Sequence, residues 1–162
     1  MSGDVNGKHN EMQIEPIGHV RRTGAGEVFV EILATYRAGL KQLDRFSHVI
    51  VLWWADRSDN PTMRGTLQCN PPYATEHTTG VFACRAEYRP NPIAVTTCEI
   101  VAVDEAHGIV RLRNIDALDG SPVLDLKAYF PVVDRVQDAH IPGYLTGWPE
   151  WLPESGIGLE EG

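Results

Sequence analysis

The sequence predicts a mainly β protein: a single antiparallel sheet of about six or seven strands, closed into a barrel, with one short helix and an irregular C-terminal wrap. Short β-branched runs separated by turn residues recur along the chain. They do not alternate with helical runs, and no GxGxxG motif follows a strand, which argues against a Rossmann-type nucleotide site. A small antiparallel sheet must cover its own apolar face, and closure into a barrel does so economically. The 162 residues suffice for one domain with a buried core.

The first third of the chain contains three predicted strands and the predicted helix. Residues 13–22 alternate in polarity and form the first strand, which a turn at 23–26 separates from a β-branched second strand at 28–33. Residues 36–43 carry apolar side chains at helical spacing over about two turns. Residues 46–54 (FSHVIVLWW) are an almost unbroken apolar run, so we expect a central strand buried on both faces.

The second half contains the remaining strands. We expect them at residues 80–84, 95–103, 109–115 and 122–126. The turn at 104–108 (DEAHG) lies between two alternating runs and predicts a hairpin.

Two stretches have no regular pattern. Residues 55–79 are polar and rich in proline, and a loop of this length inside a compact domain is usually functional or mobile. From residue 131 onward, prolines, glycines and two tryptophans (Trp148 and Trp151) indicate an irregular path over the surface.

Composition and charge limit the kinds of protein this can be. No apolar run reaches the roughly 18 residues of a membrane span, and the polar start of the chain has no export-signal pattern, so we expect a cytoplasmic protein. We expect a disordered leader at 1–12, the domain at 13–152 and an acidic flexible tail at 153–162. The net charge of −8 argues against a large polynucleotide partner unless basic groups are concentrated locally.

Cysteine and histidine usage predicts no metal site. The three cysteines form no CxxC pair, and an odd number cannot all pair within the chain, so we expect free thiols in a reducing compartment. The six histidines are scattered, without an HxH or HExxH pair. His48 lies inside the apolar run and is expected to be a core histidine rather than a catalytic one.

The segment at 80–93 (GVFACRAEYRPNPI) combines arginines with a rigid backbone. Arg89 and Asn91 each precede a proline, which restricts their backbone to extended geometry, and Arg85 lies four residues before Arg89. Rigid loops with Arg and Asn side chains hold carboxylates and polar ligands in fixed geometry. A structural turn with surface arginines explains the same residues, and composition alone favours that interpretation.

A second polar segment, residues 114–125 (NIDALDGSPVLD), places Asp116 and Asp119 at a strand end and a tight turn. Acidic side chains at such turns often accept hydrogen bonds from backbone amides. They could also accept from ribose hydroxyls or an ammonium group. The sequence favours the capping role.

These motifs occur together, and in this order, in one family. FSH at 46–48, GVFACR at 80–85, RPNPI at 89–93 and DALDGSPVLDLKAYFP at 116–131 resemble the YaeB/TrmO (TsaA-like) methyltransferases over roughly residues 13–131. The resemblance implies a single-sheet β-barrel, a homodimer, and S-adenosyl-L-methionine (SAM) bound near the dimer interface without a metal. It also implies N6-methylation of threonylcarbamoyladenosine at position 37 of tRNA.

Motif matching carries the family's cofactor contacts onto this chain. They fall on Arg85, Val95, Asp116, Ala117, Leu118 and Asp119. From the chemistry of these side chains we infer that Arg85 would meet the carboxylate of the methionine moiety and the acids its ammonium or the ribose. Val95 and Leu118 would meet the adenine. Asp56 and Arg57 stand where the family has His-Gln, and Arg21-Arg22-Thr23 stands in the region of its Pro-Arg-Gln. Candidate substrate contacts are Arg89, Asn91, Tyr73 and His77.

No catalytic residue is assigned, because the sulfonium of SAM is already activated and the protein mainly supplies orientation and electrostatic fit. Two alternatives to tRNA methylation stay open. One is the same chemistry on a small molecule, which the acidic charge and the altered 56–79 loop favour. The other is a non-catalytic module that binds an adenosyl ligand.

Overall fold

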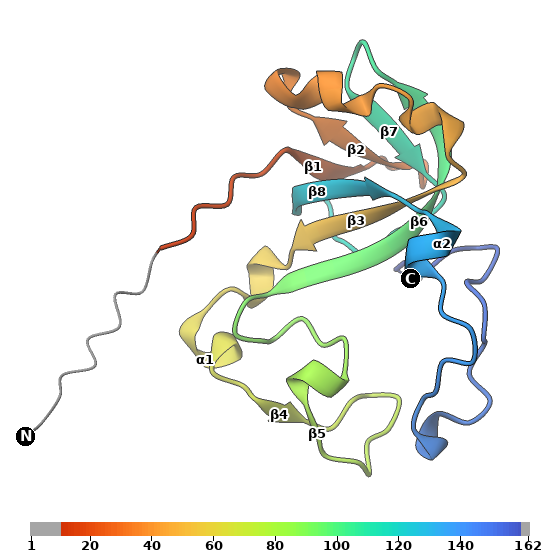
Figure 1. The fold of residues 1–162 in the computed structure, drawn as a ribbon. Helices are drawn as coiled ribbons and strands as arrows, with labels where there is room; N and C mark the ends of the chain where they lie inside the picture. Colours follow the sequence, from red (N-terminus) through yellow and green to blue (C-terminus); the bar gives the residue numbers. More distant parts are fainter. Residues whose placement is uncertain (1–10, 160–162) are drawn as a thin grey trace, which may run out of the picture.

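The barrel consists of six antiparallel strands in one closed sheet (Figure 1). The computed structural model describes residues 11–159, so nearly all of the leader predicted at 1–12 lies outside the described residues. In spatial order the strands are β1 (Gly18–Arg22), β2 (Val28–Ile32), β7 (Ile109–Leu112), β6 (Ile93–Asp104), β3 (His48–Trp54) and β8 (Pro122–Ala128). The prediction of a closed barrel of about six or seven strands is confirmed.

The barrel closes where β1 pairs with β8, with Gly18 opposite Val123. Gly18 also pairs with Ile32 of β2. A Cβ at position 18 would overlap the carbonyl oxygen of Glu31, so only glycine permits this close approach of two strands.

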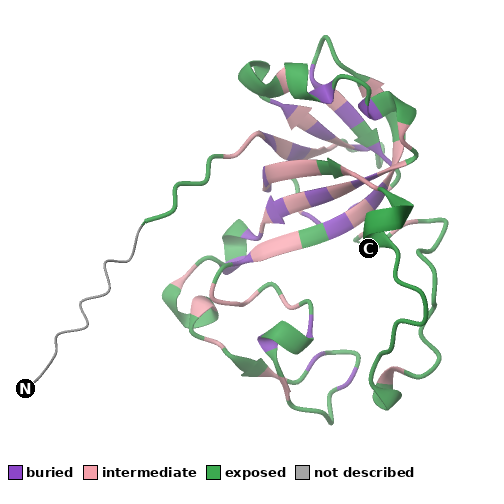
Figure 2. Cartoon of the chain, viewed as in Figure 1, coloured by how far each residue is buried: buried purple, intermediate pink, exposed green. Residues whose placement is uncertain are grey.

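Buried residues alternate with less buried ones along the barrel strands (Figure 2), and valine is the commonest residue in the interior. The fully buried valines are Val20, Val30, Val49, Val51, Val110 and Val123. The prediction that β3 is buried on both faces is wrong: its residues alternate between buried and half-buried. In an antiparallel barrel successive side chains point into and out of the core, so Trp53 is buried and Trp54 is not.

Other local predictions are also corrected. The first strand begins at Gly18 rather than at residue 13, because Pro16 cannot donate to a ladder. The helix expected at 36–43 is instead two 3-10 segments, η1 (Ala34–Leu40) and η2 (Leu43–Arg45).

Residues 55–92 leave the barrel between β3 and β6 and form a separate layer, here called the excursion, which projects beyond one end of the barrel (Figure 1). It contains η3 (Asp56–Ser58), α1 (Pro61–Arg64), η4 (Val81–Ala83) and a two-stranded sheet of β4 (Gln68–Cys69) and β5 (Thr79–Gly80). The strand expected at 80–84 is therefore wrong, since β5 ends at Gly80 and a 3-10 turn follows.

Residues 131–159, here called the C-terminal segment, run beside the excursion without a sheet partner (Figure 1). The segment contains only α2 (Pro131–Asp134) and η5 (Gly143–Leu145), which agrees with the predicted irregular wrap. The single helix of the prediction is replaced by two four-residue α-helices, α1 and α2. Near the end of the segment, Gly158 packs so closely on the Asn114 side chain that a Cβ would overlap it. Within residues 11–159, no helix is long and apolar enough to cross a membrane.

Candidate functional site

A hollow of about 890 Å³, here called the β6 hollow, lies between the excursion, the first half of β6 and the C-terminal segment. A cavity of this size falls within the range of small-molecule sites. Five of the sequence-predicted site residues line it, contributed by three separate parts of the chain: Arg85, Arg89, Asn91, Val95 and Asp116.

A chain of hydrogen bonds holds Asp116 at the wall of the hollow. The indole nitrogen of Trp53 donates to the Thr96 hydroxyl at 3.1 Å, and this hydroxyl donates to Oδ1 of Asp116. Thr96 is 3% exposed, so both of its bonds are protected from water. Burial raises the pKa of the nearby Cys98 thiol to about 12, with a smaller contribution from the negative charge of Asp116. The structure therefore presents one fixed carboxylate to the hollow.

The two arginines of the hollow differ in how they are held. Arg89 donates to the carbonyl oxygens of Val81 (2.7 Å) and Ala86 (3.2 Å), so it braces the turn that carries Arg85. Arg85 is exposed, and among the described residues no acidic side chain forms an ion pair with its guanidinium. Its donors are thus available to a carboxylate.

Arg22 fixes the loop that follows β7. Its side chain donates to the carbonyl oxygens of Ala117 (2.9 Å) and Ile115, and its backbone N–H donates to Oδ1 of Asp119 at 2.8 Å. Asp119 therefore has the capping role that the sequence favoured. Ala117 is completely buried, and neither residue lines the β6 hollow.

Three further predicted residues also lie outside the hollow. Asp56 and Arg57 are exposed on η3, and Leu118 is half-buried. The structure does not bring these side chains together with Arg85 and Asp116.

The excursion meets the C-terminal segment through two aromatic contacts. The rings of Tyr73 and Trp148 lie 4.9 Å apart edge to face, and those of His77 and Tyr144 lie 4.4 Å apart and stacked. Burial raises the pKa of Tyr73, with smaller contributions from Cys84, Tyr144 and Cys69. Trp148 lines the β6 hollow, whereas the predicted substrate contacts Tyr73 and His77 do not.

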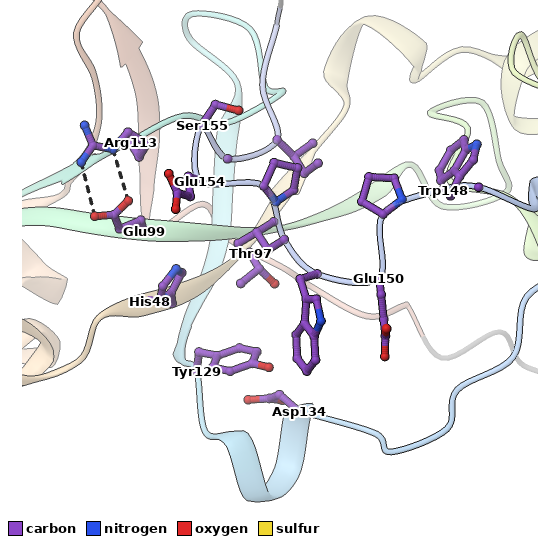
Figure 3. Close-up of a pocket in the computed structure, with 17 residues that line it drawn as sticks. His48, Thr97, Glu99, Arg113, Tyr129, Asp134, Trp148, Glu150, Glu154 and Ser155 are labelled. Atoms are coloured by element: carbon purple, nitrogen blue, oxygen red, sulfur yellow. Dashed lines mark hydrogen bonds and ion pairs between the residues drawn. The ribbon is translucent and has the colours of Figure 1, made fainter.

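A second groove of about 1450 Å³ continues from the β6 hollow along the barrel beneath the C-terminal segment (Figure 3). The two share six lining residues: Thr97, Tyr129, Asp134, Trp148, Leu152 and Ile157. In the groove Arg113 donates to both carboxylate oxygens of Glu99, at 3.2 and 3.4 Å, and holds the pKa of Glu99 below its usual value.

His48 lies in this groove, so its prediction as a core histidine is wrong. It is half-buried on the outer face of β3, where its Nδ1 lies 2.8 Å from the Ser47 hydroxyl. The strand alternates, and its inward positions are taken by Val49 and Val51.

Several residues of the site were missed. Thr96 carries no sequence signal, because its role depends on the register that places it beside Trp53. Trp148, Leu152 and Ile157 lie in the segment that sequence patterns marked only as a surface wrap. Within the described part of the chain, no cluster of three or more His, Cys, Asp or Glu side chains is arranged to hold a metal ion.

The fold and the hollow define a class of protein: a small β-barrel with a hollow of small-molecule size between its outer face and long connecting segments. Residues 8–135 match the family described as the tRNA-methyltransferase O N-terminal domain. The chain belongs to this family, as its motifs indicated.

Relatives and solved structures extend this result. A probable S-adenosyl-L-methionine-binding protein of Archaeoglobus fulgidus is 38% identical over 133 residues, covering 82% of this chain and 33% of the relative. A tRNA (adenine(37)-N6)-methyltransferase of Mus musculus is 34% identical over 102 residues, which cover 63% of this chain and 23% of the mouse protein. The crystal structure of TrmO from Pseudomonas aeruginosa matches with a TM-score of 0.62 at 28% identity, covering 80% of this chain and 61% of that one. The chain thus spans about a third of the first relative and three fifths of that TrmO structure.

Proposed function

We propose that this domain binds SAM in the β6 hollow and methylates N6 of threonylcarbamoyladenosine at position 37 of tRNA. The observation that carries the proposal is the convergence of Arg85, Val95 and Asp116 on one hollow in a chain of this family. The names of the Archaeoglobus and mouse relatives support the cofactor and the adenine acceptor.

The residues of the hollow fit the chemistry of SAM. Arg85, without an ionic partner among the described residues, suits the carboxylate of the methionine moiety. Asp116 has one oxygen held by Thr96 and suits the ammonium or a ribose hydroxyl. Val95 is 43% exposed at the wall and offers an apolar contact for the adenine.

When bound, SAM supplies a methyl group on a sulfonium whose leaving group needs no further activation. The chain's own residues hold and orient the cofactor and the acceptor. Correct positioning of two bound groups can by itself account for much of the rate increase of a transfer between them. Asp116 adds fixed negative charge, and Trp148 with Leu152 shields one side of the hollow from water. Ala117, Leu118 and Asp119 contribute indirectly, through a loop that Arg22 holds in place. We assign Asn91, Tyr73 and His77 to the acceptor side, and Arg89 to support of the Arg85 turn.

Calorimetric titration of SAM tests the cofactor site. Arg85→Ala should weaken SAM binding by about 10- to 100-fold, because a hydrogen bond to a charged group typically contributes that much to affinity. Arg57→Ala is the matched control: it removes an exposed arginine outside the hollow and should leave the affinity unchanged. Equal loss in both variants, or none in either, would contradict the assignment.

Methyl transfer is tested with tRNA that carries threonylcarbamoyladenosine at position 37. We expect a nucleoside heavier by one methyl group in digests of tRNA treated with protein and SAM. Cofactor binding without any such product would remove the tRNA assignment and leave the small-molecule acceptor or the non-catalytic binding module. A tRNA complex should also weaken steeply with salt.

We also propose a homodimer with the cofactor near its interface, located in the cytoplasm. Large apolar side chains support a protein partner: Phe82 beside the hollow is 81% exposed, and Val132 and Val133 on α2 are 89% and 74% exposed. Light scattering should give about twice the 18.0 kDa of the chain; a monomer at micromolar concentration would refute the dimer. Free cysteines and a tRNA acceptor support the cytoplasm, which cell fractionation tests.

A further inference from the structure

Two of the three cysteines lie in contact although fifteen positions separate them. The Sγ atoms of Cys69, in β4, and Cys84, after η4, are 3.7 Å apart. A disulfide needs about 2.0 Å, so the sulfurs must approach each other by less than about 2 Å. We propose that Cys69 and Cys84 form a reversible intrachain disulfide that ties β4 to the residue directly before Arg85.

The backbone holds both cysteines in this position. Cys69 pairs with Thr79 across the β4–β5 sheet, and the N–H of Val81 donates to the carbonyl of Leu67 at 3.0 Å, which continues that register. The carbonyl of Val81 in turn accepts from the Cys84 thiol at 3.6 Å and from Arg89 at 2.7 Å. These bonds hold the segments that carry the two thiols next to each other.

The third cysteine has a different environment. Cys98 is completely buried in the barrel core. Burial removes it from any oxidant in solution, so it serves as an internal control.

Oxidised glutathione is a sufficient oxidant for the step. Cys69 is half-buried and Cys84 is 8% exposed, so the Cys69 thiolate attacks the glutathione disulfide first and displaces one glutathione thiolate. The Cys84 thiolate then attacks the Cys69 sulfur, forms the Cys69–Cys84 bond and releases the second glutathione thiolate. The two thiol protons pass to the two released glutathiones. Two protein thiols are oxidised and one disulfide is reduced.

Peptide mapping of the full chain tests the bond. Protein treated with oxidised glutathione is alkylated, then cleaved by trypsin, which releases residues 65–85, and by a glutamate-specific protease, which cuts after Glu76. We expect the two halves to stay joined, lighter by about 2 Da than two separate thiol peptides for the two hydrogens lost, and to separate with dithiothreitol. Alkylated Cys69 and Cys84 after oxidation, or a separate glutathione on each, would overturn the proposal.

Two variants and an isotope experiment complete the test. Cys69→Ser must abolish the joined peptide, whereas Cys98→Ala must keep it. If Cys98→Ala does not fold, the wild-type digest still decides, because Cys98 lies in another peptide. Mixing ¹⁵N-labelled with unlabelled protein before oxidation distinguishes bonds within a chain from bonds between chains; mixed-label pairs would refute the intrachain bond.

Discussion

The barrel and the segments that line the β6 hollow are stabilised in different ways. The barrel buries a continuous set of aliphatic side chains, including Val30 and Val51, which are completely buried. The C-terminal segment, residues 131–159, contains no buried residue. It meets the excursion through aromatic pairs such as Tyr73–Trp148. The hydrophobic effect therefore determines the barrel, whereas individual contacts determine the walls of the site.

Mutations in the two regions should therefore affect stability differently. Loss of core side chains lowers the free energy of unfolding of the whole domain, because folding of a small domain is cooperative. Loss of a single contact in the outer segments opens them locally, at a smaller cost.

The largest expected effect is in the barrel core. Ile32→Ala, at a position in β2 that is 2% exposed, should lower the free energy of unfolding by about 2–5 kcal/mol, since a buried aliphatic side chain is lost and a cavity is left. Val136→Ala, at a site in the C-terminal segment that is 72% exposed, is the control and should change it by less than about 0.5 kcal/mol. Urea unfolding measures both, and similar values for the two variants would contradict the proposed division.

The next effect lies where the two regions meet. Thr96→Val leaves the Trp53 indole without an acceptor and Asp116 without a donor, so we expect a loss of about 1–3 kcal/mol in unfolding free energy. Thr97→Val, one position along β6 and half-buried, should cost less than about 0.5 kcal/mol.

SAM titration of these two variants adds a second readout. Thr96→Val should also weaken SAM binding, because Asp116 loses its fixed orientation. A Thr96→Val protein that keeps both wild-type stability and wild-type affinity would show that the hydrogen-bond chain has no role.

The sequence predicted the barrel because its signals are local. The alternation in residues such as 109–112 and the hairpin turn at 104–108 depend on neighbours in the chain, and both are present in the structure. The continuous apolar run at 46–54 was misinterpreted, since the outward residues of β3 are half-buried by other segments rather than exposed to water.

The site was predicted only in part, because its geometry depends on distant contacts. The family motifs identified Arg85, Val95 and Asp116, which the structure brings to one hollow. No sequence pattern indicates that Trp148 faces this hollow or that Thr96 links Trp53 to Asp116. Asp56 and Arg57 were predicted from motif position alone, and in the structure both are exposed and neither lines the hollow.

A smaller effect is expected for the contact between the outer segments. Tyr73→Ala removes the edge-to-face contact with Trp148, and such pairs contribute about 0.5–1.5 kcal/mol. Hydrogen exchange of residues 143–148 should therefore be about 2- to 12-fold faster, with barrel peptides unchanged. Tyr73→Phe keeps the ring and should keep the wild-type rate. Equal exchange in all three proteins would mean that this contact does not hold the segment.

The smallest effect concerns the exposed ion pair between Arg113 and Glu99 in the groove. A hydrogen bond from Arg113 and its charge lower the pKa of Glu99 in the folded protein, so the pair stabilises the fold at neutral pH. This contribution is present above the unfolded-state pKa and is lost as the pH falls through the lower folded-state value. In Arg113→Gln the Glu99 carboxyl should titrate at higher pH by NMR, while Arg111→Gln, which removes the partner of Glu27, should leave it unchanged. Added salt should narrow the difference because the pair is exposed to solvent, and an unchanged Glu99 titration in Arg113→Gln would show that Arg113 does not set it.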